Sequence, residues 1–276
     1  MSDIVIAAAK RTAIGSFLGQ FNGVPTTSLG ATAVEAALAQ SGVPASDVSE
    51  VILGCVLPAN LGQAPARQAA LAAGLPTSAG CTTINKVCGS GMKAIMLGHD
   101  LIKAGSASIV VAGGMESMTN APHLIPNSRT GNRYGGFQAV DHMAWDGLTN
   151  PYDGLSMGVF AEATADKYAF TREQQDAYTI ESVKRAQAAV ASGGFAAEIV
   201  PMTTVMGVAH ADGTIEHKEV TITADEGIRA GTTMEGVAKI KPATEGGSIT
   251  AGNASQFSDG SSAGVAMSGA LAERRR

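Results

Sequence analysis

The sequence has 276 residues, of which 45% are hydrophobic and 16% are charged, and this balance is typical of a folded globular protein rather than a disordered one. The formal net charge of −5 provides no overall positive field, so we expect no nucleic-acid partner. The longest apolar runs, such as residues 51–57, are far shorter than the roughly 20 residues of a membrane-spanning helix, so we expect no membrane partner.

Apolar segments with the character of strands alternate with helical patterns at the start of the chain. Strands are predicted at residues 4–8, 51–56, 82–87 and 109–112, and helices at 29–40, 65–73 and 91–104. Thr27 or Ser28 would cap the first helix, and Gly42 would end it. Continuous apolar strands that alternate with helices indicate an α/β fold, in which a mixed, mainly parallel sheet is covered by helices.

The character of the chain changes after residue 118, where polar loops become more frequent. A helix is predicted with Thr171 as its N-cap, Gln174 at the capping-box position and Gly193-Gly194 at its end. A hairpin is predicted around Asp212-Gly213. We interpret residues 119–248 as an inserted α+β domain.

The chain then returns to its first pattern, with apolar segments at 249–251 and 264–267. The predicted first domain is therefore discontinuous and comprises residues 1–118 and 249–276. Residues 270–276 have the composition of a helix without a stop signal, so we expect the natural domain to continue beyond Arg276.

Cys88 lies in the segment of residues 85–92, Asn-Lys-Val-Cys-Gly-Ser-Gly-Met, between a predicted strand and a predicted helix. The helix N-terminus favours the thiolate form of a cysteine, and Lys86 adds positive charge. Gly89 and Gly91 would let a substrate carbonyl approach backbone N–H groups that form an oxyanion hole. Two readings follow, because Cys88 has the setting of a nucleophile while a lone cysteine is often a small buried apolar side chain.

The other cysteines are Cys55 and Cys81, and the three form no even framework and no Cys-x-x-Cys pair. We therefore expect free thiols in a reducing, cytoplasmic compartment rather than disulfides or a bound metal. The first residues, 1–7, have neither the basic start nor the cleavage site of a signal peptide.

The segment from Asn85 to Gly91 resembles the active-site cysteine signature of the thiolases, the acetyl-CoA C-acyltransferases. Further segments similar to thiolase motifs occur in the same order at 11–15, 62–69, 112–118 and 250–255, with Asp259-Gly260 after them. Thiolases pair two similar half-domains and carry a loop domain inserted in the first. The resemblance implies that this chain matches the first half-domain and the loop domain.

The resemblance also implies a reaction and a set of contacts. Thiolases of fatty acid metabolism convert acyl-CoA and acetyl-CoA reversibly to 3-oxoacyl-CoA and CoA through an acyl-cysteine, here Cys88, with CoA thioesters as substrates and no permanently bound cofactor. The residues at positions that contact substrate or CoA in the family are Leu148, Ser156, Met157, Arg229, Ala251 and Ser255.

By resemblance, Ser255 would bond the pantetheine, Leu148 and Ala251 would line its tunnel, and Met157 would lie beside the thioester. Arg229 would lie near the adenine. From the residues alone, Arg229 also fits a solvated surface charge, and Ser255 also fits a hydroxyl that caps a turn.

Two positions depart from the family pattern. Ser156 replaces a histidine of some biosynthetic members, and Thr244 replaces a frequent phenylalanine, so the expected preference for a short acyl chain is weakened. The Asn-Glu-Ala-Phe, Gly-His-Pro and Cys-Gly-Gly-Gly motifs of the family's second half do not occur in these 276 residues. We therefore predict that this chain alone is largely inactive.

Five histidines occur outside those motifs and are predicted to be loop or surface residues: His99, His123, His142, His210 and His217. Family resemblance suggests a homodimer or homotetramer, with contacts around residues 129–141 and with His123 and His142 near a neighbouring subunit. Two alternatives remain: a condensing enzyme like the ketoacyl synthases, and a non-catalytic fragment that binds CoA or a complementary C-terminal chain through an exposed apolar face.

Overall fold

The computed structural model describes residues 3–209 and 214–275, which form two compact units. The first unit comprises Met1–Pro122, Glu198–Asp225 and Ser258–Arg276, and the second comprises His123–Ala197 and Glu226–Phe257. Among the described residues, no helix is both long enough and apolar enough to cross a membrane.

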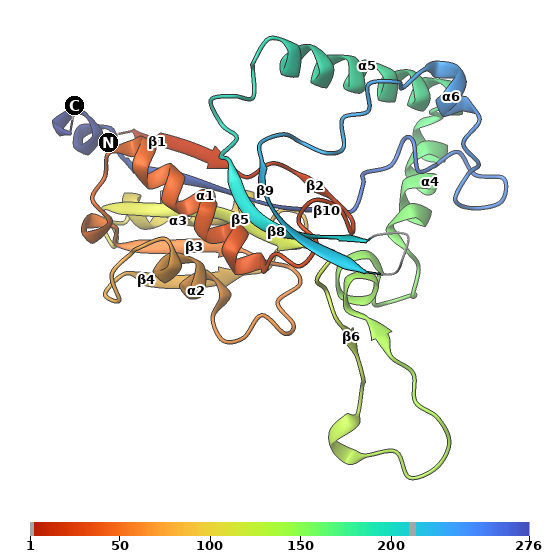
Figure 1. Ribbon diagram of the computed structural model, residues 1–276, viewed down its shortest axis with the longest axis horizontal. Coiled ribbons are helices and arrows are strands. Elements are labelled where there is room, and N and C mark those ends of the chain that lie inside the picture. Colours follow the sequence, from red (N-terminus) through yellow and green to blue (C-terminus); the bar gives the residue numbers. More distant parts are fainter. Residues whose placement is uncertain (1–2, 210–213, 276) are drawn as a thin grey trace. The chain divides into compact units, whose positions relative to one another are not determined.

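A mixed sheet with the strand order β1-β10-β5-β3-β4 forms the centre of the first unit, and β2 pairs with β10 (Figure 1). Its strands are β1 (Ile4–Arg11), β2 (Gly15–Ser16), β3 (Glu50–Gly54), β4 (Gly80–Ile84), β5 (Ile109–Ser117) and β10 (Ser258–Ser268). Strands β4, β3 and β5 are parallel to one another, while β10 is antiparallel to β5, β1 and β2. Only β10 therefore opposes the common direction, which confirms the predicted mixed, mainly parallel α/β sheet.

Helices cover both faces of this sheet, and its strand residues alternate between them. The helical elements of the unit are α1 (Thr26–Ser41), η1 (Ala45–Asp47), α2 (Pro65–Ala72), α3 (Ser90–Lys103) and α7 (Gly269–Arg274). On β5, Ile109 and Val111 join the core under α1 and α2, whereas Val110 and Ala112 pack against α3 on the other face. The near-continuous apolar character of β5 follows from this burial on both sides.

Several element boundaries differ from the predictions. Helix α1 begins at Thr26 with Pro25 as its N-cap residue and no side-chain cap, so the prediction of Thr27 or Ser28 as N-cap is wrong. Gly42 ends the helix in the left-handed conformation, as predicted. Strand β5 runs on to Ser117 because it pairs with β10 along its whole length, and β10 begins only at Ser258.

The hairpin of β8 (Met202–Ala209) and β9 (Ile215–Ile222) belongs to the first unit, whereas the prediction assigned it to the insert. Ile222 is buried in a cluster with Phe21 and Leu29. Residues before and after the hairpin are also joined to β1, because Arg11 forms ion pairs with Glu198 at 2.8 Å and with Asp225 at 2.7 Å. The turn predicted at Asp212-Gly213 lies outside the described residues.

We expect Asp225→Asn to lower the free energy of unfolding by about 2–3 kcal/mol at pH 7, because it leaves Arg11 with a weakened partner. Burial alone raises the pKa of Asp225, but the Arg11 guanidinium and the Ile14 N–H together hold it below its usual value. The folded state therefore binds this proton less tightly than the unfolded state, so the stabilisation is present above pH ~4 and disappears as the pH falls further.

Urea unfolding at pH 7 and pH 3 tests this expectation, with the exposed Glu219→Gln on β9 as the control. The difference in unfolding free energy between the Asp225→Asn variant and the unchanged protein should shrink at pH 3. An equal difference at both pH values would contradict the assignment.

The second unit contains α4 (Met157–Tyr168), α5 (Arg172–Ala191) and α6 (Met234–Ala238), together with short elements. These are β6 (His123–Leu124), the 3-10 helix η2 (Ser128–Thr130), β7 (Val140–Asp141) and the π-helix η3 (Met143–Leu148). The predicted capping box of α5 is confirmed: Thr171 Oγ1 accepts from the Gln174 N–H at 3.3 Å, and Gln174 Oε1 accepts from the Thr171 N–H at 2.9 Å. This box fixes the start of the longest helix in the unit.

Candidate functional site

Cys88 lies in the first unit, on the turn that joins β4 to α3, and it is exposed. Its exposure excludes the reading of a small buried apolar side chain. Gly89 is the N-cap residue of α3, so the thiol stands at the beginning of that helix, as the sequence predicts. The backbone N–H groups of a helix start give this position a partial positive charge.

The turn before Cys88 is held in an unfavourable backbone conformation. Val87 has a φ of +48°, in the left-handed region that β-branched residues avoid. Its N–H donates to Asn85 Oδ1 at 2.8 Å, and its carbonyl accepts from Ser90 Oγ at 2.6 Å. The buried Ser90 hydroxyl also accepts from the Lys86 N–H at 2.8 Å. Asn85 and Ser90 thus hold the conformation that presents Cys88, a role that the sequence analysis missed.

Two backbone N–H groups next to Cys88 are already used inside the turn. The Gly89 N–H donates to the Lys86 carbonyl and the Ser90 N–H donates to the Val87 carbonyl, both at 3.1 Å. The expected oxyanion hole is therefore not built from the Gly89 N–H. Any donor to a substrate oxygen beside Cys88 must be another group.

Glu116, at the end of β5, holds the loop that follows β3. Its carboxylate accepts from the Val56 N–H at 2.7 Å and from the Leu57 N–H at 3.0 Å. The Cys55 thiol lies 3.6 Å from the same carboxylate. Burial and this nearby negative charge raise the pKa of Cys55 to about 12, and burial also raises the pKa of Cys81. The three thiols therefore have different environments.

Iodoacetamide at pH 8 should modify Cys88 first in the folded protein, Cys81 more slowly, and Cys55 only after unfolding. The reagent attacks thiolates that it can reach, and Cys55 is 1% exposed and protonated. Mass spectrometry of peptides at successive times measures the three rates. Modification of Cys55 as fast as Cys88 would contradict the described packing.

Three of the predicted contact residues lie close together in the second unit. Leu148 is half-buried at the end of η3, while Ser156 and Met157 are exposed at the start of α4. A β-bridge between Thr149 and Ser156 closes the loop between them. Leu148 and Met157 therefore flank the two ends of one closed loop.

The other three predicted contact residues of the second unit are also exposed. Arg229 is exposed, and its backbone carbonyl accepts from Gln187 Nε2 of α5 at 2.9 Å. Ala251 lies on a turn that begins at the buried Thr250 and closes at Ala254, and Ser255 directly follows that turn. Residues 249–251 thus form no strand of the central sheet, because Thr250 makes only an isolated bridge with Pro242.

The histidines differ from the prediction at one position. His99, His123 and His217 are exposed, and His210 lies outside the described residues. His142 is 5% exposed and its Nδ1 lies 2.5 Å from Asp146 Oδ2, so the prediction of a loop or surface residue is wrong there. Within 3–209 and 214–275, no group of three His, Cys, Asp or Glu side chains could hold a metal ion.

The sequence is similar to known proteins over nearly its whole length. The family model for the N-terminal domain of thiolase matches residues 4–270. An acetyl-CoA acetyltransferase of Pseudomonas aeruginosa is 47% identical over 99% of this chain and 68% of its own length. Acetyl-CoA acetyltransferase 1 of Arabidopsis thaliana is 47% identical over 97% of this chain and 63% of its own length. The chain therefore spans about two thirds of the length of these relatives.

Proposed function

Because the chain belongs to the thiolase family of acyltransferases, we propose that Cys88 accepts the acyl group and that acetyl-CoA and other acyl-CoA thioesters are the substrates. The observation that carries this proposal is the exposed thiol at the start of α3, on a turn whose conformation Asn85 and Ser90 maintain. The reaction of acyl-CoA with acetyl-CoA to give 3-oxoacyl-CoA and CoA is reversible. It passes through acyl-Cys88 and requires no permanently bound cofactor.

In the first step, the Cys88 thiolate attacks the thioester carbonyl. The bond between the acyl carbon and the sulfur of CoA breaks, and a bond from that carbon to Cys88 Sγ forms. CoA leaves as a thiolate and takes up the proton that Cys88 released. The free thiols fit a reducing, cytoplasmic compartment.

The six exposed or half-exposed residues of the second unit supply the proposed contacts with CoA. Arg229 would stack on the adenine or pair with a phosphate, since a guanidinium does both. Ser255 would bond the pantetheine, and Leu148 and Ala251 would provide its apolar wall. Met157 and Ser156 would lie at the thioester end, where Ser156 adds a neutral hydroxyl that does not titrate near pH 7.

Incubation of the 276-residue protein with acetyl-CoA should place one acetyl group on the peptide that contains Cys88 and release an equal amount of CoA. Turnover of acetoacetyl-CoA should be slow, because these residues contain no Gly-His-Pro motif and a nucleophile without its base loses most of its rate. Mass spectrometry and a thiol assay measure the two outcomes. Acetylation of a different residue would refute the role of Cys88.

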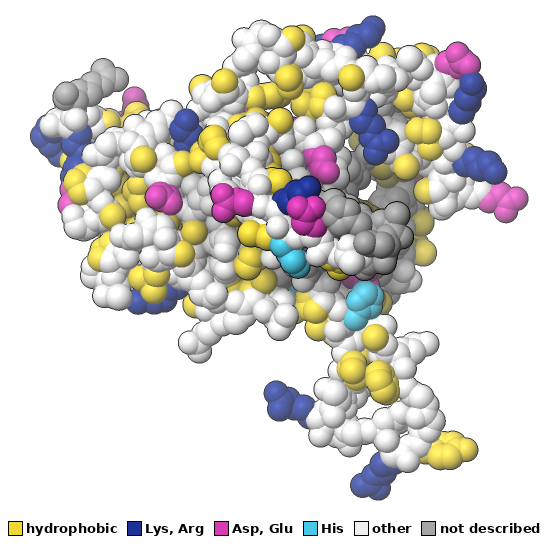
Figure 2. Space-filling view, in the orientation of Figure 1, with side chains coloured by type: hydrophobic (Ala, Val, Ile, Leu, Met, Phe, Trp, Pro, Cys, Tyr) yellow, Lys and Arg dark blue, Asp and Glu magenta, His cyan; other side chains and the backbone are white. Residues whose placement is uncertain are grey.

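Assembly with further protein has support from exposed apolar side chains. In the first unit, Ile6, Met92 and Ile95 line a groove of about 440 Å³ and are 57%, 72% and 37% exposed. In the second unit, apolar and basic side chains gather on the segment between β6 and β7, where Tyr134 is 98% exposed (Figure 2). We propose that the groove receives a complementary domain or chain and that the segment forms contacts of a homodimer or homotetramer.

A further inference from the structure

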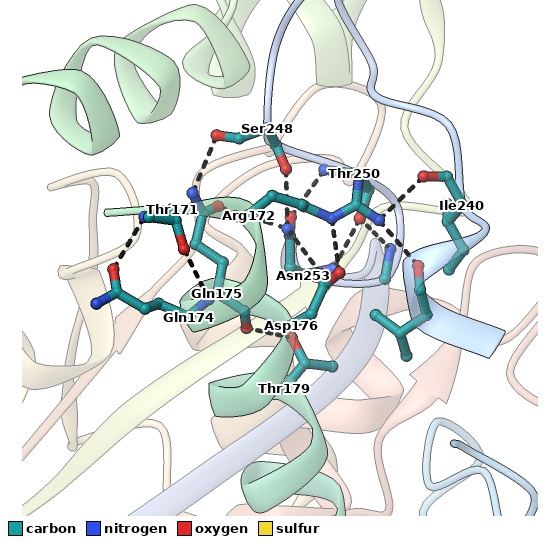
Figure 3. A network of polar contacts seen from close by, with 12 residues as sticks. Thr171, Arg172, Gln174, Gln175, Asp176, Thr179, Ile240, Ser248, Thr250 and Asn253 are labelled. Atoms are coloured by element: carbon teal, nitrogen blue, oxygen red, sulfur yellow. Dashed lines mark hydrogen bonds and ion pairs between the residues drawn. The ribbon is translucent and has the colours of Figure 1, made fainter. Parts of the chain in front are cut away.

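The beginning of α5 carries a network of polar side chains that joins separate segments of the second unit (Figure 3). At its centre, Arg172 Nε lies 2.7 Å from Asp176 Oδ2, one helical turn away. Asp176 is 2% exposed, so its carboxylate is surrounded by the partners in the network rather than by water.

Arg172 extends the network to α6. Its Nη2 donates to the carbonyl of Val237 at 2.9 Å and to the carbonyl of Ile240 at 3.0 Å. Val237 lies in the last turn of α6, where its carbonyl also accepts from the Ile240 N–H at 3.0 Å, and Ile240 lies just after the helix, so Arg172 adds two bonds to the residues that end α6. The same side chain therefore neutralises Asp176 and fixes the end of α6.

Asn253 extends the network to the turn that bears Ala251. Its Nδ2 lies 3.4 Å from Asp176 Oδ1 and 3.0 Å from the Ser248 carbonyl, and its Oδ1 accepts from the Thr250 N–H at 2.7 Å. The turn is thus folded around Asn253, and Asn253 faces the carboxylate of Asp176 (Figure 3).

Two further contacts hold the same segments. Glu162 of α4 accepts from the N–H groups of Ser248 and Ile249 at 2.9 Å and 2.8 Å. Gln187, further along α5, donates to the Arg229 carbonyl at 2.9 Å. The segment that bears Arg229 is therefore bound to α5. The segment of residues 248–255, which bears Ala251 and Ser255, is bound to both α5 and α4.

We propose that Asp176 and Arg172 are positioning residues for CoA binding, because they hold the turn of Ala251 and Ser255 in one conformation. The proposal rests on the proposed function, which assigns CoA contacts to those residues. A flexible surface turn binds a ligand weakly, because binding must first order the turn and this costs conformational entropy. A turn that hydrogen bonds already hold in its binding conformation does not pay this entropy on binding. The Asp176 side chain is 3% exposed, so without Arg172 its carboxylate would be buried with only neutral partners such as the Asn253 amide.

The test compares Asp176→Asn with Glu181→Gln on the 276-residue protein. Glu181 forms an exposed pair with Arg185 on the same helix and touches none of the fastened segments, so it is a matched control. Calorimetry measures the dissociation constant of CoA, amide hydrogen exchange reports on residues 248–255, and the rate of Cys88 alkylation checks the first unit. We expect Asp176→Asn to raise the dissociation constant of CoA at least tenfold and to accelerate amide hydrogen exchange at residues 248–255. The rate of Cys88 alkylation should stay within twofold of the unchanged protein. Glu181→Gln should change none of the three measurements.

Unchanged exchange at residues 248–255 in Asp176→Asn overturns the proposal, and so does faster exchange with unchanged CoA affinity. If Asp176→Asn does not fold, Arg172→Lys takes its place in the same three measurements. This variant keeps a positive charge beside Asp176 but loses the contacts of the guanidinium with the Val237 and Ile240 carbonyls. Failure of the proposed function shows differently: Arg229→Ala and Ser255→Ala would bind CoA as tightly as the unchanged protein. Hydrogen exchange then still decides whether the network holds the turn.

Discussion

Cys88→Ala is expected to abolish transfer of an acetyl group from acetyl-CoA to the protein and to leave only the background labelling of a protein without a nucleophile. As the proposed nucleophile, Cys88 would form the bond that the label requires, so the variant has no thiol at the start of α3 to carry it. Cys55 is buried with a pKa of about 12, so it offers no reachable thiolate, and Cys81 is half-buried with a pKa that burial raises, so it reacts more slowly than Cys88. The measurement is the rate at which radioactive acetyl groups become bound to the protein.

Cys81→Ala is the control for this experiment, because it removes a thiol from β4 without touching the turn before α3. We expect this variant to keep the label of the unchanged protein. Residual labelling of Cys88→Ala at a rate near that of Cys81→Ala would show that acyl transfer uses a different residue.

The fold of the first unit was predictable where the signal is local. The apolar runs of β1, β3 and β5 and the glycine at the end of α1 appear directly in the sequence, because burial and helix termination depend on adjacent residues. The placement of the β8–β9 hairpin was not predictable, since it depends on the contact of Arg11 with Asp225, which is 214 positions away. Polar side chains that meet across such a separation leave no periodic pattern.

The candidate site shows the same division. The strand, the glycines and the helical pattern around Cys88 predict a thiol at a helix start, and the structure places it there. The sequence does not reveal that Val87 adopts a positive φ, or that Ser90 is the residue that closes the turn. In the second unit, the spacing of Arg172 and Asp176 is visible as a pair one turn apart, but Asn253 joins them only through the tertiary fold.

Gly54→Ala is expected to destabilise the protein by about 3 kcal/mol and to slow acetylation of Cys88, because the start of α3 packs directly on the backbone of β3. A Cβ at residue 54 would lie 2.5 Å from the Cβ of Ser90, 2.8 Å from its carbonyl carbon and 2.9 Å from the Gly91 nitrogen. Two of these atoms are backbone, so a side-chain rotation cannot relieve the clash. The helix start must move, and the Ser90 hydroxyl moves with it.

Gly114→Ala is the matched control, since Gly114 pairs with Gly54 across β3 and β5. A Cβ at Gly114 meets its nearest atom, the Gly91 Cα, at 3.4 Å, which is ordinary van der Waals contact. Urea unfolding and the rate of acetylation are measured for both variants. If Gly54→Ala is as stable as Gly114→Ala within about 0.5 kcal/mol, the close packing of α3 on β3 is wrong. If Gly54→Ala loses stability but acetylates Cys88 at the rate of Gly114→Ala, the Ser90 contacts are not what presents the thiol.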